Sequence, residues 1–219
     1  MERKITIMGV LQEGISIGLQ NAASVLIAII LWLVTIWIPY LNVGTTIAIS
    51  SIPIALSKGQ IISPFFIFDA KYRQYMGEYF TLLGLMYIAL VPAMLFLIVP
   101  AIIISIGWSL AVYILIDKEV APGEALIQSN KATNGYKWTI FGVSFILIVV
   151  LFILTTIFGL LGSTIGAIMT IVLLVLFMLI ILGCNTVIYR NLVLKNNDDN
   201  NVTEEPASTE SPVSPIYTK

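Results

Sequence analysis

Long apolar stretches without a single charged residue dominate the chain. Three of them contain no Asp, Glu, Lys or Arg, and they cover Gly14–Ser57, Tyr79–Ile116 and Trp138–Tyr189. A transmembrane helix needs about 20 consecutive apolar residues, and each block is roughly twice that length. We therefore predict two membrane-spanning helices in each block. The predicted fold class is an all-α integral membrane protein with six transmembrane helices, arranged as three hairpins.

Helix-breaking residues indicate where each block reverses direction. They gather at "PYLNVG", Pro39–Gly44, in the first block, between Pro92 and Pro100 in the second, and at "GLLGSTIG", Gly159–Gly166, in the third. The helix near Val43–Ser57 has the weakest apolar signal, because it is rich in Gly, Ser, Thr and Ala. Such small residues favour close packing between helices inside a bundle.

Composition and charge agree with a multi-pass protein of the cell membrane. Hydrophobic residues make up 58% of the chain and charged residues 11%, and the mean hydropathy is +1.00. Two spans per block place every charged segment on the same side, and the positive-inside rule predicts that this side, with both termini, is cytoplasmic. The basic residues outside the blocks include Arg3, Lys4, Lys58, Lys71, Arg73, Lys118, Lys131, Lys137, Arg190 and Lys195.

The same pattern divides the chain into three parts. Residues 1–20 are predicted to form an amino-terminal amphipathic segment, and residues 21–195 form the six-helix transmembrane domain. Residues 196–219 are polar and rich in Asp, Glu, Ser and Pro. A segment of this composition cannot bury enough apolar surface to fold, so we predict a disordered acidic tail.

One phrase occurs twice in the sequence, as an internal repeat. "GEYFTLLG" begins at Gly77 and "GYKWTIFG" begins at Gly135, and a proline precedes each at equal distance. Proline favours the first turn of a helix and glycine favours the position after its end, which predicts short cytoplasmic amphipathic interfacial helices at about 64–77 and 122–135. Each glycine would then turn the chain into the bilayer, with Phe80 or Trp138 as an interfacial anchor.

Four basic residues lie close to these two glycines. Lys71, Arg73, Lys131 and Lys137 are candidate contacts for anionic lipids, because a basic side chain at the cytoplasmic leaflet is attracted to anionic headgroups. The same four charges also serve to fix the topology, and the sequence favours neither role over the other.

The residues needed for most enzyme chemistry are missing from the chain. It contains no histidine and one cysteine, Cys184, which falls within the last apolar block. We therefore expect no metal site, no cofactor, no catalytic nucleophile and no bound nucleic acid. Two further hypotheses concern the cytoplasmic surface: a carboxylate active site built from Asp69 and Asp117, and an ion pair of Asp117 with Arg190.

Polar residues within the blocks have a simpler interpretation. Thr155, Thr156, Ser163 and Asn185 are expected to form hydrogen bonds between helices, because no Asp, Glu, Lys or Arg accompanies them at membrane depth.

Two stretches carry a resemblance to a known family. With "FIFD" at Phe66–Asp69 and "EALIQSNKATNGYKWTIFG" at Glu124–Gly142, the chain resembles uncharacterised bacterial six-helix membrane proteins. That family is related to the membrane domain attached to some glycerophosphoryl diester phosphodiesterases. The catalytic module of those enzymes is a separate soluble domain that uses histidine and carboxylates, and this chain lacks it. The resemblance implies a membrane domain that anchors or assists another protein.

Two classes of function follow from these observations. The first is a non-enzymatic membrane scaffold that contacts the bilayer, anionic lipids, or an unknown membrane or cytoplasmic protein. The alternative is a transporter, a channel or a transporter subunit, since internal repeats are common in transporters.

Overall fold

The computed structural model describes residues 5–60, 62–96, 98–160 and 163–195, and every regular element within these ranges is a helix. Five helices are long and apolar enough to cross a membrane, and a sixth is added if the bent pair at the amino terminus forms one span. This all-helical architecture is compatible with a membrane protein. The predicted acidic tail, 196–219, lies outside the described residues, as do Arg3 and Lys4.

The elements follow one another with short connections. In chain order they are α1 (Ile7–Gln20), α2 (Ala22–Thr35), α3 (Pro39–Ser50), α4 (Ile52–Ser57), η1 (Pro64–Phe68), α5 (Lys71–Gln74), α6 (Met76–Phe96), α7 (Ile98–Gly107), α8 (Ala111–Lys118), α9 (Pro122–Thr133), α10 (Lys137–Gly159), α11 (Ser163–Tyr189) and the π-helical turn η2 (Arg190–Leu194).

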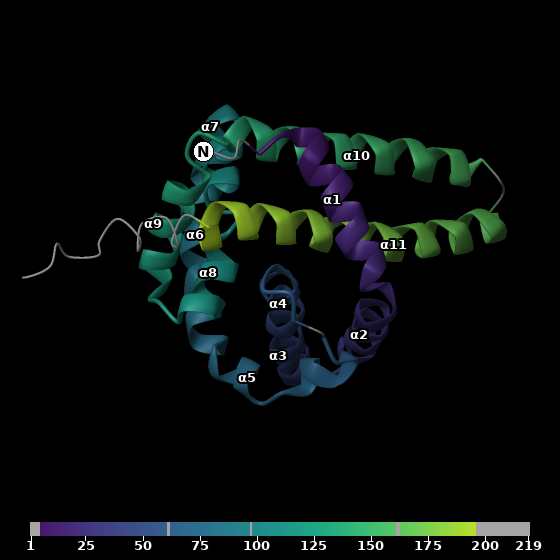
Figure 1. The fold of residues 1–219 in the computed structure, drawn as a ribbon, viewed down its shortest axis with the longest axis horizontal. Coiled ribbons are helices and arrows are strands. Elements are labelled where there is room, and N and C mark those ends of the chain that lie inside the picture. The colour runs from purple at the N-terminus through teal and green to yellow at the C-terminus, as the bar shows by residue number, and fades with distance from the viewer. Residues whose placement is uncertain (1–4, 61, 97, 161–162, 196–219) are drawn as a thin grey trace, which may run out of the picture.

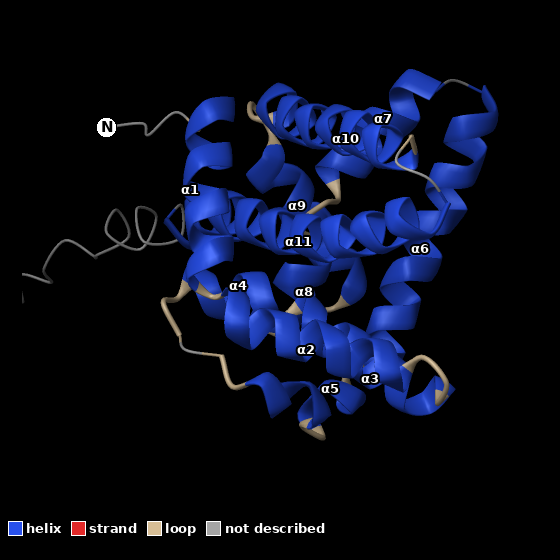
Figure 2. Ribbon diagram, turned by 90° about the vertical axis from the view of Figure 1, so that its right-hand side faces the viewer, coloured by secondary structure: helices blue, strands red, loops and turns tan. Residues whose placement is uncertain are grey.

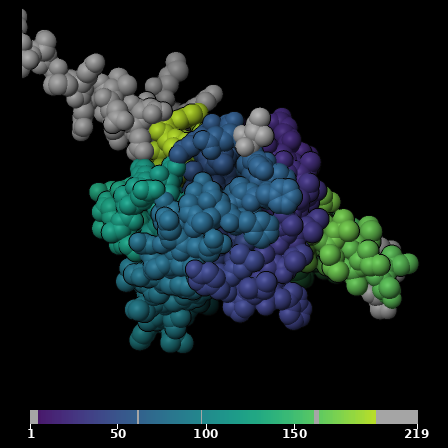
Figure 3. Space-filling view, turned by 90° about the horizontal axis from the view of Figure 1, so that it is seen from below, coloured from purple at the N-terminus to yellow at the C-terminus, as the bar shows by residue number. Residues whose placement is uncertain are grey.

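Helix α11 is the central element of the fold. Figure 1 shows it between α10 on one side and the helices α2, α3 and α4 on the other, and Figure 2 shows the same order from a direction 90° away. Its carboxyl-terminal part is buried through Leu182, Cys184, Val187, Ile188 and Tyr189. Its amino-terminal part is apolar but exposed, and Figure 3 shows the α10–α11 end projecting from the body of the molecule.

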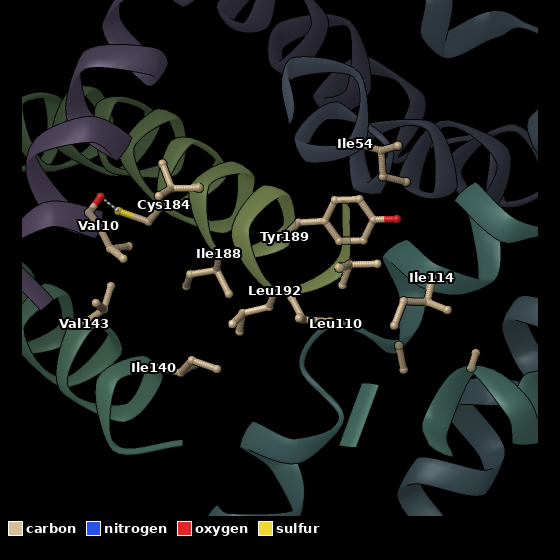
Figure 4. Close-up of a cluster of buried hydrophobic side chains, with 14 of the residues drawn as sticks. Val10, Ile54, Leu110, Ile114, Ile140, Val143, Cys184, Ile188, Tyr189 and Leu192 are labelled. Atoms are coloured by element: carbon tan, nitrogen blue, oxygen red, sulfur yellow. Dashed lines mark hydrogen bonds between the residues drawn. The ribbon is translucent and has the colours of Figure 1, made fainter. Parts of the chain in front are cut away.

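Two clusters of buried side chains meet at α11. One contains residues of α1, α8, α9, α10 and α11, and the other contains residues of α2, α3, α4 and η1 with Leu179 and Leu182 of α11. Figure 4 shows part of the first cluster, in which the ring of Tyr189 extends from α11 toward Ile54 of α4 and Ile114 of α8. Both clusters therefore depend on the same stretch of α11.

Helix α1 occupies most of the range predicted as the amino-terminal segment, residues 1–20, and it packs against the bundle. Val10 and Leu11 lie in the first buried cluster. Gly14 and Gly18 face α11 so closely that a Cβ atom added at Gly14 would come within 2.8 Å of the Cys184 backbone, and one at Gly18 within 2.6 Å of the Leu179 carbonyl oxygen. Small residues four apart allow two helix backbones to approach each other in this way.

The connection from α1 to α2 bends by 77° at Asn21. The Asn21 side chain donates a hydrogen bond to the Ile17 carbonyl oxygen at 3.0 Å, so it caps the end of α1. Helix α2 then ends at Thr35 and α3 begins at Pro39. The turn between the two helices therefore lies several residues before the centre of the predicted turn at 39–44. Proline is favoured at the first position of a helix, so here it begins α3 instead of lying within a turn.

The second and third blocks each contain two long helical segments. In the second block α6 ends at Phe96 and α7 begins at Ile98, within the predicted interval between Pro92 and Pro100. Both prolines lie inside helices, Pro92 in α6 and Pro100 in α7. In the third block α10 ends at Gly159 and α11 begins at Ser163, within the predicted interval 159–166.

The predicted single helix at 64–77 is wrong. The chain forms the 3₁₀ helix η1, an extended residue at Asp69, and then the single-turn helix α5. The Asp69 carboxylate accepts a hydrogen bond from the Lys71 backbone N–H at 3.1 Å, which is a local alternative to helical hydrogen bonding. Gly77 lies inside α6, and it is not among the described glycines with positive φ.

The predicted helix at 122–135 is present as α9, Pro122–Thr133, and Gly135 follows it with a φ of 83°. This left-handed conformation favours glycine, as expected for a residue that turns the chain between α9 and α10.

Candidate functional site at the charged helix ends

Charged and tyrosine side chains at the ends of the three blocks meet where α4, α8 and α11 end. Asp117, the penultimate residue of α8, forms an ion pair with Lys58, the residue after α4. The second carboxylate oxygen of Asp117 accepts a hydrogen bond from the Tyr189 hydroxyl at 2.6 Å. The Asp117 side chain is 9% exposed, and both of its carboxylate oxygens have partners from other parts of the chain. These contacts join three helices at one point.

A second polar contact lies beside the first. Tyr75, which follows α5, donates a hydrogen bond from its hydroxyl to the Glu119 carboxylate at 2.5 Å. This bond, followed by burial, raises the pKa of Tyr75 to about 12. Glu119 ends α8 with a φ of 52°, a conformation that is uncommon for residues other than glycine. The contact therefore holds a backbone position that has some intrinsic conformational cost.

A polar cavity of about 240 Å³ lies beside these two contacts, and it is lined in part by Lys58, Tyr75, Asp117 and Glu119. Tyr72 forms part of its wall, and its hydroxyl lies 3.0 Å from the Ser51 hydroxyl in a hydrogen bond between buried groups. Lys71 lies at the same cavity, with its ammonium 4.9 Å from the centre of the Tyr72 ring. The polar and charged residues that line the cavity are Ser51, Lys58, Gln60, Lys71, Tyr72, Tyr75, Asp117 and Glu119.

The predicted ion pair between Asp117 and Arg190 is wrong. Arg190 instead forms an ion pair with Glu13 of α1, and Asp117 pairs with Lys58. The reason is that α1 packs across α11 and brings Glu13 to Arg190. The two residues are far apart in the sequence, so their order along the chain does not predict this contact. The Asp69 carboxylate accepts a hydrogen bond from the Lys71 backbone N–H and lies 3.7 Å from the Lys71 ammonium. Both contacts of Asp69 are therefore with a residue two positions along the chain.

The four candidate lipid contacts have different surroundings. Lys71 lies at the polar cavity, and Arg73 is half-buried with its aliphatic chain against Gly44. Lys131 is exposed on α9. Lys137, the first residue of α10, donates a hydrogen bond from its ammonium to the Asn130 side-chain oxygen at 3.0 Å.

The predicted anchors also differ from one another. Trp138 is 84% exposed and Phe80 is 53% exposed, which leaves both rings available to a bilayer interface. Of the two glycines, only Gly135 has the left-handed backbone expected of a turn into the membrane, whereas Gly77 is helical.

Helix α9 is held to the break between α7 and α8 by small hydroxyl side chains. Ser129 donates to the Gly107 carbonyl oxygen at 2.7 Å and accepts from the Leu110 backbone N–H at 3.2 Å. Thr133 lies 3.2 Å from the same Gly107 oxygen. Both hydroxyl residues are fully buried. The contacts satisfy backbone groups that the helix break would otherwise leave without partners.

An apolar groove of about 330 Å³ lies between α7 and the first turn of α10. Lys137, Trp138 and Phe141 line its α10 side, and four aliphatic residues line its α7 side, namely Val99, Ile102, Ile103 and Ile106. Lys137 is the charged residue among those that line this groove.

A second groove of about 260 Å³ runs between α10 and α11, with Cys184, Asn185 and Ser144 in its wall. Thr155 and Thr156 both bond to the Phe152 carbonyl of their own helix, so the predicted interhelical bonds are wrong for these two residues. The Ser163 side chain lies outside the described atoms.

The sequence did not predict the contacts among Lys58, Asp117 and Tyr189. The available signal was their position, because each residue lies at the end of a charge-free block. Within the described residues, no group of three or more His, Cys, Asp and Glu side chains is placed to hold a metal ion.

Comparisons with known proteins give no relative for this chain. No family model matches it, and no curated protein or solved structure shows significant similarity to it.

Proposed function

We propose that the chain is a six-pass protein of the cell membrane, with both termini in the cytoplasm, that acts as a non-enzymatic scaffold for lipids and a partner protein. The three blocks would form three transmembrane hairpins, and the charged surface between them would face the cytoplasm. We also propose that the chain is related to the six-helix membrane proteins that it resembles, which are themselves related to phosphodiesterase membrane domains. The proposed role is to hold a cytoplasmic surface at the membrane.

The observation that carries this proposal is the meeting of the block ends. The first block is bordered by Glu13 and Lys58, and their partners are Arg190 and Asp117, of which Asp117 also binds Tyr189. The ends of the second block are likewise joined, through Tyr75 and Glu119. A block that crosses a bilayer twice returns its two ends to one side. Contacts between the ends of the blocks support that arrangement.

The pairing of these charges also supports a structural role. The Asp117 carboxylate forms an ion pair with Lys58 and accepts a hydrogen bond from Tyr189, and these partners come from two other parts of the chain. A carboxylate held in this way ties helices together, and removing one partner leaves a poorly solvated charge. The cluster therefore favours a rigid scaffold over an active site.

Cysteine labelling tests the topology in intact cells. In a Cys184→Ser background, single cysteines replace Asn42, Leu160 or Gln128, and the cells are treated with a membrane-impermeant thiol reagent. We expect labelling at positions 42 and 160, and at 128 only after the membrane is permeabilised. Labelling of position 128 alone in intact cells would overturn the proposed orientation.

The polar cavity at Lys58 and Asp117 is the observation that favours the alternative, a transporter or channel. Purified protein in proteoliposomes with internal pyranine and a K⁺ gradient distinguishes the two functions. A scaffold should dissipate proton and K⁺ gradients no faster than protein-free vesicles. A faster flux that Asp117→Asn abolishes would contradict the scaffold and support transport through this cavity.

A further inference from the structure

The groove between α7 and α10 lies on the outer surface of two apolar helical segments. Val99 is 66% exposed, Ile103 is 47% exposed and Trp138 is 84% exposed. Both segments belong to helices that are long and apolar enough to cross a membrane. In a bilayer, an outward-facing apolar groove is filled by hydrocarbon, because water cannot satisfy its hydrogen bonds there.

One end of this groove carries a positive charge in a defined position. The aliphatic part of Lys137 lines the groove, and its ammonium is held by the Asn130 oxygen at 3.0 Å. A lysine that lies along an apolar surface in this way places its charge at the polar boundary. Trp138, next to it, has the amphipathic ring that is enriched at membrane interfaces. The groove therefore combines an apolar wall with a cationic end.

We propose that this groove binds a phospholipid with an anionic headgroup, with one acyl chain along α7 and the phosphate at the Lys137 ammonium. The proposal rests on the proposed function, because it assumes that Lys137 lies at headgroup depth. It assigns the lipid contact to one of the four basic residues near the repeated phrases. A neutral lipid would gain the apolar contact without the charge interaction.

The other basic residues lack this combination. Lys71 faces the polar cavity and already has a carboxylate neighbour in Asp69. Arg73 packs against Gly44. Lys131 is exposed on the same helix as Asn130, and it is not among the residues lining the groove. Lys131 is therefore a matched control for a general effect of positive charge.

Native mass spectrometry of the full chain in detergent, with added dioleoylphosphatidylglycerol or dioleoylphosphatidylcholine, measures this preference. We expect Lys137→Gln to weaken phosphatidylglycerol binding about fivefold, the ratio that corresponds to about 1 kcal/mol for one lysine at an anionic surface. Phosphatidylcholine binding should stay within about twofold, and Lys137→Arg should restore the preference. Lys131→Gln should change neither lipid by more than about twofold.

A second variant tests the apolar wall of the groove. Ile103→Trp fills the space beside α7, and it should weaken both lipids while the melting temperature of the protein is retained. Equal effects of Lys137→Gln and Lys131→Gln, or unchanged binding in Lys137→Gln or in folded Ile103→Trp, would overturn the proposed site. Cysteine labelling and vesicle flux do not depend on this groove, so failure here is separable from failure of the proposed scaffold.

Discussion

The two copies of the repeated phrase have similar sequences and different structures. In the second copy, α9 is a continuous helix, Gly135 turns the chain with a positive φ, and α10 follows. In the first copy, the corresponding segment is divided into η1 and α5, and Gly77 lies within α6. A shared pattern of proline, glycine and aromatic residue therefore does not define the local structure by itself.

The residues between proline and glycine explain the difference. Ser129 and Thr133 are small and hydroxylated, and they bury against the Gly107 carbonyl group. The residues at equal distance from the first proline are Lys71 and Tyr75, which line the cavity that Asp117 and Glu119 also line. A long cation and a phenol cannot make the close backbone contact that holds α9 in place.

Exchange of the residues at this position should have the largest effect. Ser129→Lys would place an ammonium at a fully buried site, and an unpaired buried charge costs about 3 kcal/mol or more. The reverse change, Lys71→Ser, removes an exposed charge and should alter stability by less than about 0.5 kcal/mol. Thermal unfolding in detergent, followed by tryptophan fluorescence, measures both. Similar melting temperatures for the two variants would show that the copies are equivalent at this position.

The two glycines should respond in opposite directions to alanine. Gly135→Ala is expected to destabilise the protein by about 1–2 kcal/mol, because an L-residue at positive φ is strained. Gly77→Ala should leave the protein unchanged or stabilise it by up to about 1 kcal/mol, because the residue is helical and has space for a Cβ atom. Chemical unfolding in a fixed detergent compares the free energies. Equal losses in both variants would refute the distinction drawn between these glycines.

Asp69 should matter for the first copy alone. Asp69→Ala removes the hydrogen bond from the Lys71 backbone N–H to the Asp69 carboxylate, and a hydrogen bond of this kind contributes about 1 kcal/mol. We expect backbone amides in 71–75 to exchange with solvent about fivefold faster, as hydrogen–deuterium exchange would measure. Ile127 occupies the equivalent position in α9 and is about half exposed, so Ile127→Ala serves as the control with little change in exchange of 129–133. Unaltered exchange after loss of Asp69 would mean that another contact forms the break.

The smallest expected effect is a pH dependence at Tyr75. Its pKa is raised to about 12 from the ordinary tyrosine value of 10.0, so the folded protein holds this proton more tightly than the unfolded chain does. The resulting stabilisation is complete below pH 10 and is lost as the pH rises toward 12. The stability difference between the parent protein and Tyr75→Phe should therefore narrow over this interval. A constant difference from pH 9 to 12 would contradict the proposed bond to Glu119.

Much of the architecture could be predicted from the sequence. The positions of α6, α7, α10 and α11 follow from the apolar blocks, because transfer of apolar helices into hydrocarbon depends mainly on composition and length. The prediction was weaker where short polar residues compete locally for backbone hydrogen bonds, as at Asp69. It did not include the packing of α1 on α11, which depends on Gly14 and Gly18 meeting another helix.

The candidate sites were predictable only in part. Lys137 and Trp138 were identified as interfacial residues, but the groove beside them requires α7, which lies more than 30 residues earlier in the chain. Lys58, Asp117 and Tyr189 each lie at a block end, and nothing in their order along the chain identifies them as partners.

The sequence alone therefore determined that this is an apolar, helical protein whose charges are confined to the segments between three long blocks. That property is local, because each residue contributes to hydropathy and charge independently of distant residues. The tertiary structure decided which charges pair, how α1 crosses α11, and why one copy of the repeat is a helix and the other is broken. Those outcomes depend on distances between residues far apart in sequence, and ion pairs, hydrogen bonds and close helix contacts act over only a few ångströms.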